Sequence, residues 1–143
     1  PVMERVFIET TIPSFYFDTR AEPRLRDWQF QTRLWWDRYR AHYSLITSHL
    51  VVAEFERSPA AKSKEADRFF HGVTIIEEPA GFNDVVRHYL AIASMLGAEF
   101  LLTWNCRHLA NANKQRHIKV LNGRLGLHTP IITTPMELIP GVA

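Results

Sequence analysis

The chain has 143 residues with 46% hydrophobic and 22% charged side chains, an ordinary composition for a soluble globular protein. This length fits one domain with a sizeable core; no apolar run is long enough to span a bilayer, and no secretory signal pattern is present. The single cysteine, Cys106, excludes an intramolecular disulfide and indicates a reducing compartment, which we expect to be the cytoplasm. Because no base can be assigned to Cys106, we favour a packed free thiol over a nucleophile.

The first predicted strand, over 5–8, ends at an acidic residue, Glu9. A helix follows, with Thr10 or Thr11 as its cap and Pro13 in its first turn. A carboxylate at the end of a buried strand is costly unless it is solvated, paired or bound to a cation. Glu9 is therefore the first candidate functional residue.

After a charged loop over 20–26, the pattern predicts a helix over 27–42. Its neighbouring Trp35 and Trp36 cannot both point the same way. We expect one of them to pack in the core, while the other covers a neighbouring helix or a second subunit.

The second predicted strand, over 43–46, is followed by a helix over 49–57. Glu54 lies on or near the apolar side of this helix, one turn after Leu50. An exposed helix residue with no special role is the simpler interpretation of a lone glutamate there. Ser58 and Pro59 then predict the start of another helix, over 59–70.

The second half of the chain continues the alternation of strands and helices. The predicted elements are a strand at 73–76, a helix at 83–95 that ends at Gly97, a strand at 98–102, helices at 106–112 and 113–125, a strand at 130–133 and a short helix from 134. Strands that alternate with helices imply a parallel sheet with helices on both faces. We therefore predict one α/β domain over 1–143, with about five strands.

Polar side chains follow three of these strands. Glu9 follows the first strand, Glu54 lies on the helix after the second, and Asn105 follows the apolar run 100–102. These elements can converge at one carboxyl-end crevice, where carboxylates would bind Mg²⁺ or Mn²⁺ through hard oxygen ligands. Such metals promote phosphodiester cleavage. For Asn105, a plain helix N-cap is the alternative.

The net charge of +2 is a weak clue, but its distribution is more informative, because the stretch 100–136 contains no Asp or Glu. The charged side chains of this segment are all basic, which predicts contacts with RNA phosphates. A solvated basic face is the alternative. The residues that we expect at the RNA are Arg107, His108, Lys114 and Arg116.

Three segments, VFIETTIPSFYFDTR, SHLVVAEFERSP and FLLTWNCRHLANA, resemble the PIN domain, and specifically the toxin-like ribonucleases of the VapC type. Together with PIITTPMELI they span most of the chain. The resemblance implies a Rossmann-like sheet and cleavage of RNA that depends on Mg²⁺ or Mn²⁺. It also implies a homodimer and an antitoxin partner.

The same resemblance assigns roles to individual residues. Glu9 stands at the family's first acidic position and Glu54 at the second, so both are implied as catalytic metal ligands. Asn105 stands where many members have a further Asp, and Thr103 is implied as the hydroxyl near the metal or phosphate. Because Asn lacks a negative charge, metal binding should be weaker than in those members.

One further acidic residue of the family falls on Val86 here, and Asp84, the nearest carboxylate, is out of phase with that position and more typical of an N-cap. The helix over 83–95 also replaces two helices of the family. We therefore predict that a segment is missing between Leu90 and Ala91, so that their Cα atoms lie much farther apart than the roughly 3.8 Å of a trans peptide. A real deletion is the alternative.

Ribonuclease activity is thus the leading hypothesis. The first alternative is a PIN module that binds nucleic acid without cutting it. The second is a partner-binding scaffold that uses Trp35 and Trp36 as its interface.

Overall fold

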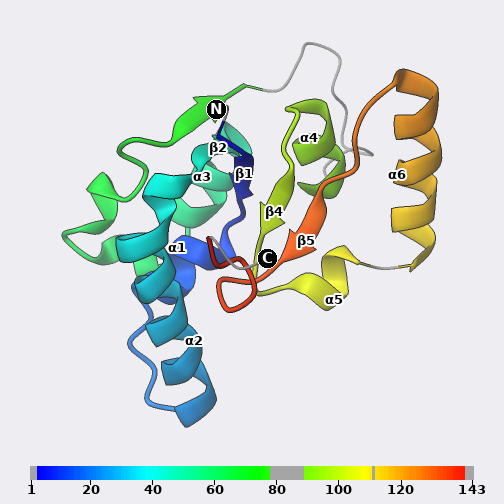
Figure 1. The fold of residues 1–143 in the computed structure, drawn as a ribbon. Coiled ribbons are helices and arrows are strands. Elements are labelled where there is room, and N and C mark those ends of the chain that lie inside the picture. Colours follow the sequence, from blue (N-terminus) through cyan, green and yellow to red (C-terminus); the bar gives the residue numbers. More distant parts are fainter. Residues whose placement is uncertain (1–2, 78–88, 111, 141–143) are drawn as a thin grey trace.

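A computed structural model of the chain describes residues 3–77, 89–110 and 112–140. Its centre is a five-stranded parallel sheet with the strand order β3-β2-β1-β4-β5. Helices lie on both sides of this sheet (Figure 1). The strands are β1 (Arg5–Ile8), β2 (Ser44–Ser48), β3 (Thr74–Ile76), β4 (Phe100–Leu102) and β5 (Ile131–Thr133). The predicted α/β class and parallel sheet are confirmed.

The sheet divides the hydrophobic core into two halves, because alternate side chains of a strand point to opposite faces. In β1, Val6 and Ile8 belong to one buried cluster and Phe7 to the other. The Val6 face packs against Trp35 and Phe55, among others. The face of Phe7 packs against α4 and α6, the long helix at the edge of the molecule in Figure 1.

Five helices are close to the predicted positions. They are α1 (Thr11–Tyr16), α3 (His49–Glu56), α4 (Tyr89–Met95), α5 (Cys106–Leu109) and α6 (Ala112–Leu125). The described part of α4 ends as expected at Gly97, whose φ of 74° is accessible to glycine at little cost. In the described ranges, none of the helices combines the length and apolar character needed to cross a membrane.

The predicted helix over 27–42 begins too late and is not α-helical throughout, although the helical path ends at His42 as predicted. Helix α2 (Pro23–Leu34) begins earlier, inside the expected charged loop, and continues as a π-turn (Trp35–Tyr39) and a 3-10 turn (Arg40–His42). Trp35 stacks on Tyr43 and Trp36 stacks on Phe69, with ring centroids 5.7 Å and 4.0 Å apart. Both indoles are buried, at 1% and 5% exposure. The expectation that one of them could face a second subunit is therefore wrong.

Two other predicted helices do not form. The segment 59–70 contains two 3-10 turns, Pro59–Lys62 and Ala66–Arg68, because the extended conformation of Ser63 interrupts the helical path. After β5 the Thr134 hydroxyl donates to the Glu137 carboxylate at 3.1 Å, a bond between side chains and not the side chain-to-backbone pair of a capping box, and only one turn follows.

The predicted break between Leu90 and Ala91 is also wrong. Both residues lie within the continuous helix α4, with Leu90 fully buried. Asp84 and Val86, the positions considered for a further acidic residue, lie outside the described residues.

The two-sided core predicts a large penalty for truncating a central strand residue. Leu101 of β4 is 0% exposed and belongs to the cluster around Phe7. We expect Leu101→Ala to lower the free energy of unfolding by about 2–5 kcal/mol in urea denaturation. The control is Leu125→Ala, because Leu125 is 67% exposed. Equal effects of the two substitutions would contradict this core.

Candidate active site

The site is built around Glu9, which directly follows β1. The order of the strands reverses between β1 and β4, and open α/β sheets bind ligands at the carboxyl ends of the strands at such a point. The Glu9 backbone N–H continues the pairing by donating to the Leu102 carbonyl at 3.2 Å. Its side chain is only 4% exposed. The first polar residue after β1 is thus held at the switch point of the sheet.

Two threonine hydroxyls hold the Glu9 carboxylate. Thr11 donates to Oε1 at 2.6 Å, and Thr103, which follows β4, donates to the same oxygen. The Thr11 backbone N–H also interacts favourably with this carboxylate. The turns after β1 and β4 therefore both fix the orientation of the Glu9 carboxylate.

The same hydroxyls also join the turns after β1 and β4. Thr11 Oγ1 accepts the Trp104 backbone N–H at 2.8 Å, and Thr103 Oγ1 accepts that of Asn105 at 2.9 Å. Thr103 is fully buried, so in this structure it positions Glu9 and does not face an RNA phosphate directly. The hydroxyls that orient Glu9 therefore also hold the turn after β1 against the turn after β4.

Glu54 lies on α3 and acts on Glu9 electrostatically. The pKa of Glu9 is raised, mainly by burial; hydrogen bonds from Thr103 and Thr11 oppose this shift, and the negative charge of Glu54 adds to it. The side chain of Glu54 is exposed. The structure thus brings the two predicted carboxylates into one electrostatic neighbourhood, one of them buried and the other in contact with solvent.

Tyr89, on α4, is a residue of this site that the search for carboxylates missed. Its phenol lies near both Glu54 and Thr10, which influence its pKa. The buried Thr10 hydroxyl nevertheless completes no hydrogen bond of good geometry within the described part of the chain. Burial, with the charges of Glu54 and Glu9, raises the pKa of Tyr89 to about 12, although Thr10 lowers it, so Tyr89 is neutral at ordinary pH. Its spacing from the buried Ile92 and Ala93, three and four residues later, is the signal that places it inward.

Asn105 occupies the N-cap position of α5 but does not cap the helix with its side chain. Its backbone carbonyl accepts the Leu109 N–H at 3.1 Å, and its side chain is exposed. The carboxamide is therefore available at the same edge of the sheet as Glu9.

Cys106 is a partly buried free thiol beside this site. Its pKa is raised by burial first, and then by the charges of Glu137 and Glu9. Because the thiolate is the nucleophilic form, this environment disfavours nucleophilic chemistry at Cys106.

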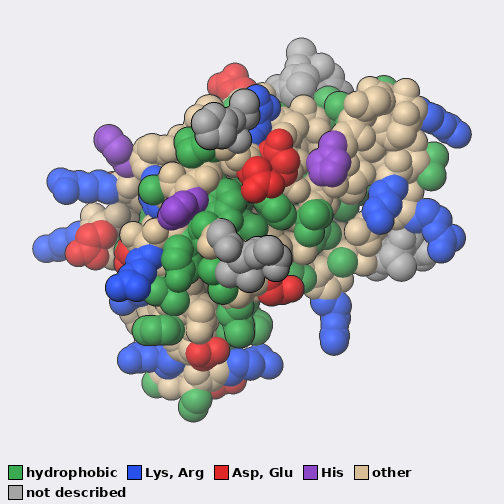
Figure 2. Space-filling view, viewed as in Figure 1, with side chains coloured by type: hydrophobic (Ala, Val, Ile, Leu, Met, Phe, Trp, Pro, Cys, Tyr) green, Lys and Arg blue, Asp and Glu red, His purple; other side chains and the backbone are tan. Residues whose placement is uncertain are grey.

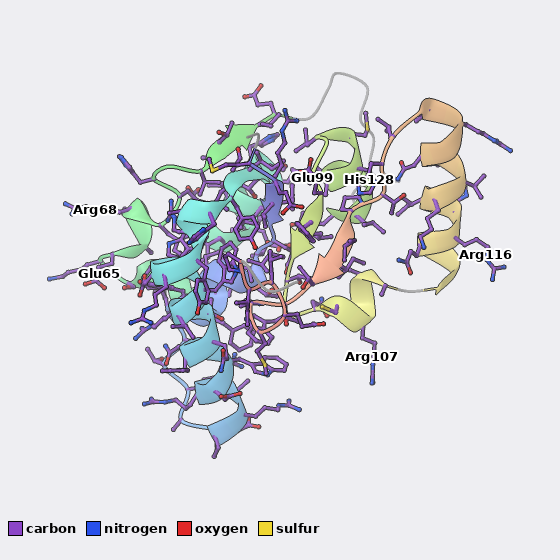
Figure 3. The ribbon with its side chains drawn as sticks, viewed as in Figure 1. Glu65, Arg68, Glu99, Arg107, Arg116 and His128 are labelled. Atoms are coloured by element: carbon purple, nitrogen blue, oxygen red, sulfur yellow. The ribbon has the colours of Figure 1, made fainter. Side chains whose placement is uncertain are left out.

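The predicted basic residues do not converge on one point. Arg107 projects from α5, at the end of the molecule where the carboxyl ends of the strands lie, whereas Arg116 projects from the outer side of α6 (Figure 3). Both side chains are exposed. His108 and Lys114 belong to α5 and α6, but their side chains lie outside the described part of the structure.

The side chains around Glu9 fit a hard divalent cation held by few protein ligands. In the described ranges there is no cluster of three or more His, Cys, Asp or Glu side chains that could hold a metal. Mg²⁺ is commonly bound through one or two carboxylates together with water and substrate phosphates. Glu9 and the exposed Glu54 are the two carboxylates of this site that could serve as such ligands.

The chain matches no protein-family model, no curated protein sequence and no solved structure.

The burial of Glu9 predicts a specific pH dependence of stability. The pKa of Glu9 is raised in the folded state, so protonation of its carboxylate favours folding. This contribution to the free energy of unfolding is fully present below the unfolded pKa of roughly 4.3 and is lost as pH rises through the folded pKa. Glu9→Gln removes this titration. We expect its free energy of unfolding, relative to the wild type, to increase from about pH 4 to about pH 8 in urea titrations with EDTA present.

The matched control is Glu56→Gln, since Glu56 is an exposed residue of the same helix as Glu54. Its difference from the wild type should change much less with pH. A constant difference between Glu9→Gln and the wild type would contradict the raised pKa.

Proposed function

We propose that this chain is a metal-dependent ribonuclease of the PIN type, which hydrolyses RNA phosphodiester bonds with Mg²⁺ or Mn²⁺ at Glu9 and Glu54. The observation that supports the proposal is the buried carboxylate of Glu9 at the switch point of a parallel sheet, where the negative charge of Glu54 adds to the rise in its pKa. The resemblance of the three sequence segments to the VapC type supports the same function.

The electrostatics of the site favour a bound cation. A buried carboxylate next to a second negative charge is costly in its ionised form. A divalent cation offsets both charges and favours the ionised form of Glu9. When bound, the cation supplies Lewis-acid polarisation of a phosphate oxygen and activation of water.

The surrounding residues serve to orient these groups. Thr11 and Thr103 fix Oε1 of Glu9, and the neutral Tyr89 phenol lies near Glu54. The exposed amide of Asn105 is placed to donate a hydrogen bond to a phosphate oxygen. Oriented groups of this kind hold a scissile phosphate without moving during the reaction.

Binding of nucleic acid without cleavage is the second candidate. It is favoured by the continuous helix α4, which removes the argument for a missing segment at Leu90. It is also favoured by the neutral Asn105 at a position that is acidic in many members of the family. From the resemblance we also propose a homodimer and a neutralising antitoxin; the buried Trp35 and Trp36 take no part in such contacts.

The ribonuclease proposal predicts metal-dependent cleavage. Purified protein should cut single-stranded RNA with Mn²⁺ or Mg²⁺ and lose this activity in EDTA. Glu9→Gln and Glu54→Gln should each lower the cleavage rate by about 100-fold or more, because each removes a ligand charge. Glu56→Gln should retain the wild-type rate. Cleavage that persists in EDTA would overturn the metal mechanism, and RNA binding without cleavage would favour the second candidate.

The basic segment predicts salt-dependent RNA binding, which can be measured in EDTA. Charge reversal at Arg107, Lys114 and Arg116 together should weaken binding and reduce the slope of log affinity against log salt by roughly 0.7 per lost phosphate contact. Among the single variants, Arg107→Glu should have a larger effect than Arg116→Glu, because Arg107 is nearer the carboxyl edge of the sheet (Figure 3).

Arg68→Glu is the control, since Arg68 is exposed and projects from the opposite side of the molecule (Figure 3). A salt slope that is unchanged in the triple variant would mean that the segment is only a solvated face.

A further inference from the structure

Three aromatic rings meet at the carboxyl edge of the sheet. Trp28 of α2 stacks on Trp104, which follows β4, with ring centroids 5.0 Å apart and planes at 8°. Phe15 of α1 contacts both edge-on, with centroids at 5.2 Å and 6.4 Å. All three rings are partly exposed, and neither Phe15 nor Trp28 belongs to either core cluster. The three rings are therefore not simply part of the hydrophobic core.

Hydrogen bonds fix the stack in place. The Trp104 indole N–H donates to the Thr32 hydroxyl at 2.7 Å, and Thr32 is fully buried and donates to the Trp28 carbonyl at 2.6 Å. The Trp104 backbone N–H donates to Thr11, whose hydroxyl also binds Glu9. The aromatic cluster is thus rigid and is connected to Glu9 through a single hydroxyl.

Arginine side chains lie against the same rings. The Arg24 guanidinium is 5.4 Å from the Trp28 centroid, and that of Arg20 is 5.8 Å from the Phe15 centroid. Arg20 is paired with Asp18, whereas Arg24 has no ion-pair partner in the described part of the chain. Figure 2 shows hydrophobic and basic side chains, with some acidic ones among them, at the end of the molecule that α2 forms. Flat apolar faces beside a positive charge suit a base attached to a phosphate.

We propose that Phe15, Trp28 and Trp104 form a stacking platform for a base of single-stranded RNA, with Arg24 at its phosphate. The proposal rests on the proposed function for the identity of the ligand as RNA. Single-stranded RNA is recognised by stacking of its unpaired bases on aromatic side chains and on arginine planes. Stacking beside Glu9 places the neighbouring phosphodiester at the carboxylate pair and selects unpaired RNA over duplex.

The test compares binding of two short oligonucleotides in EDTA, so that no cleavage occurs. One is single-stranded RNA, and the other has the same number of phosphates but lacks bases. Trp28→Leu keeps an apolar side chain and removes the ring. We expect it to weaken binding of the RNA about tenfold and to leave binding of the abasic strand unchanged.

The matched control is Phe30→Leu, because Phe30 lies on the same helix, is 62% exposed and makes no ring contact with the described residues. It should bind both strands as the wild type does. Thr32→Val offers a second variant, since it removes the hydroxyl that orients Trp104 and keeps both indoles. It should weaken RNA binding in the same base-dependent way.

The outcomes separate this proposal from the proposed function. A base-dependent loss in Trp28→Leu supports the platform even if the wild type never cleaves RNA with Mn²⁺. Cleavage by the wild type together with unchanged RNA binding by Trp28→Leu overturns the platform and leaves the nuclease standing. Equal losses for both strands, or wild-type protein that prefers neither strand, also overturn it, because stacking acts only on a strand that has bases.

Discussion

The hydrogen bonds of the Glu9 carboxylate are the interaction on which the site depends. Glu9 ends the central strand of the sheet, and its Oε1 accepts from hydroxyls that follow two different strands, β1 and β4. The turns after these strands therefore cannot separate without leaving a buried carboxylate unsatisfied, which is costly. The geometry of the site and the pairing of β1 with β4 support one another.

The two-sided core explains why this arrangement is rigid. β1 is covered on both faces, since Val6 and Ile8 pack into one cluster and Phe7 into the other. A strand buried on both faces cannot shift its register by one residue without exchanging every side chain between the clusters. The position of Glu9, one residue beyond Ile8, is thereby set by hydrophobic packing.

The sequence alone predicts those elements that are encoded by a local pattern of apolar and polar residues. All five strands were predicted near their observed positions, because each is a short apolar run bounded by polar or turn-forming residues. Glu9 and Glu54 could be placed at one edge because the carboxyl ends of parallel strands meet there.

The features that failed depend on contacts between distant segments. The π-turn at Trp35 allows two adjacent indoles to be buried against Tyr43 and Phe69, and helical periodicity cannot foresee those partners. The expected helix over 59–70 was replaced by two 3-10 turns, because Ser63 is extended between them, and the local pattern does not reveal this interruption. Tyr89 was not predicted as a residue of the site because its side chain is uncharged, although a phenol can also orient a carboxylate.

The charge of the site bears on how a nucleic acid could approach it. Tyr89, with a pKa raised to about 12, is neutral near pH 7, and Asn105 is neutral at every pH. Glu9 and Glu54 can therefore supply two negative charges, which a divalent cation would balance. Under the proposed function the loaded site would then not repel a phosphate, and a further carboxylate would bind the cation more tightly but add such repulsion. Under the same proposal, the neutral Tyr89 and Asn105 would weaken the hold on the cation and ease the approach of the RNA backbone, for an enzyme and for a binding module alike.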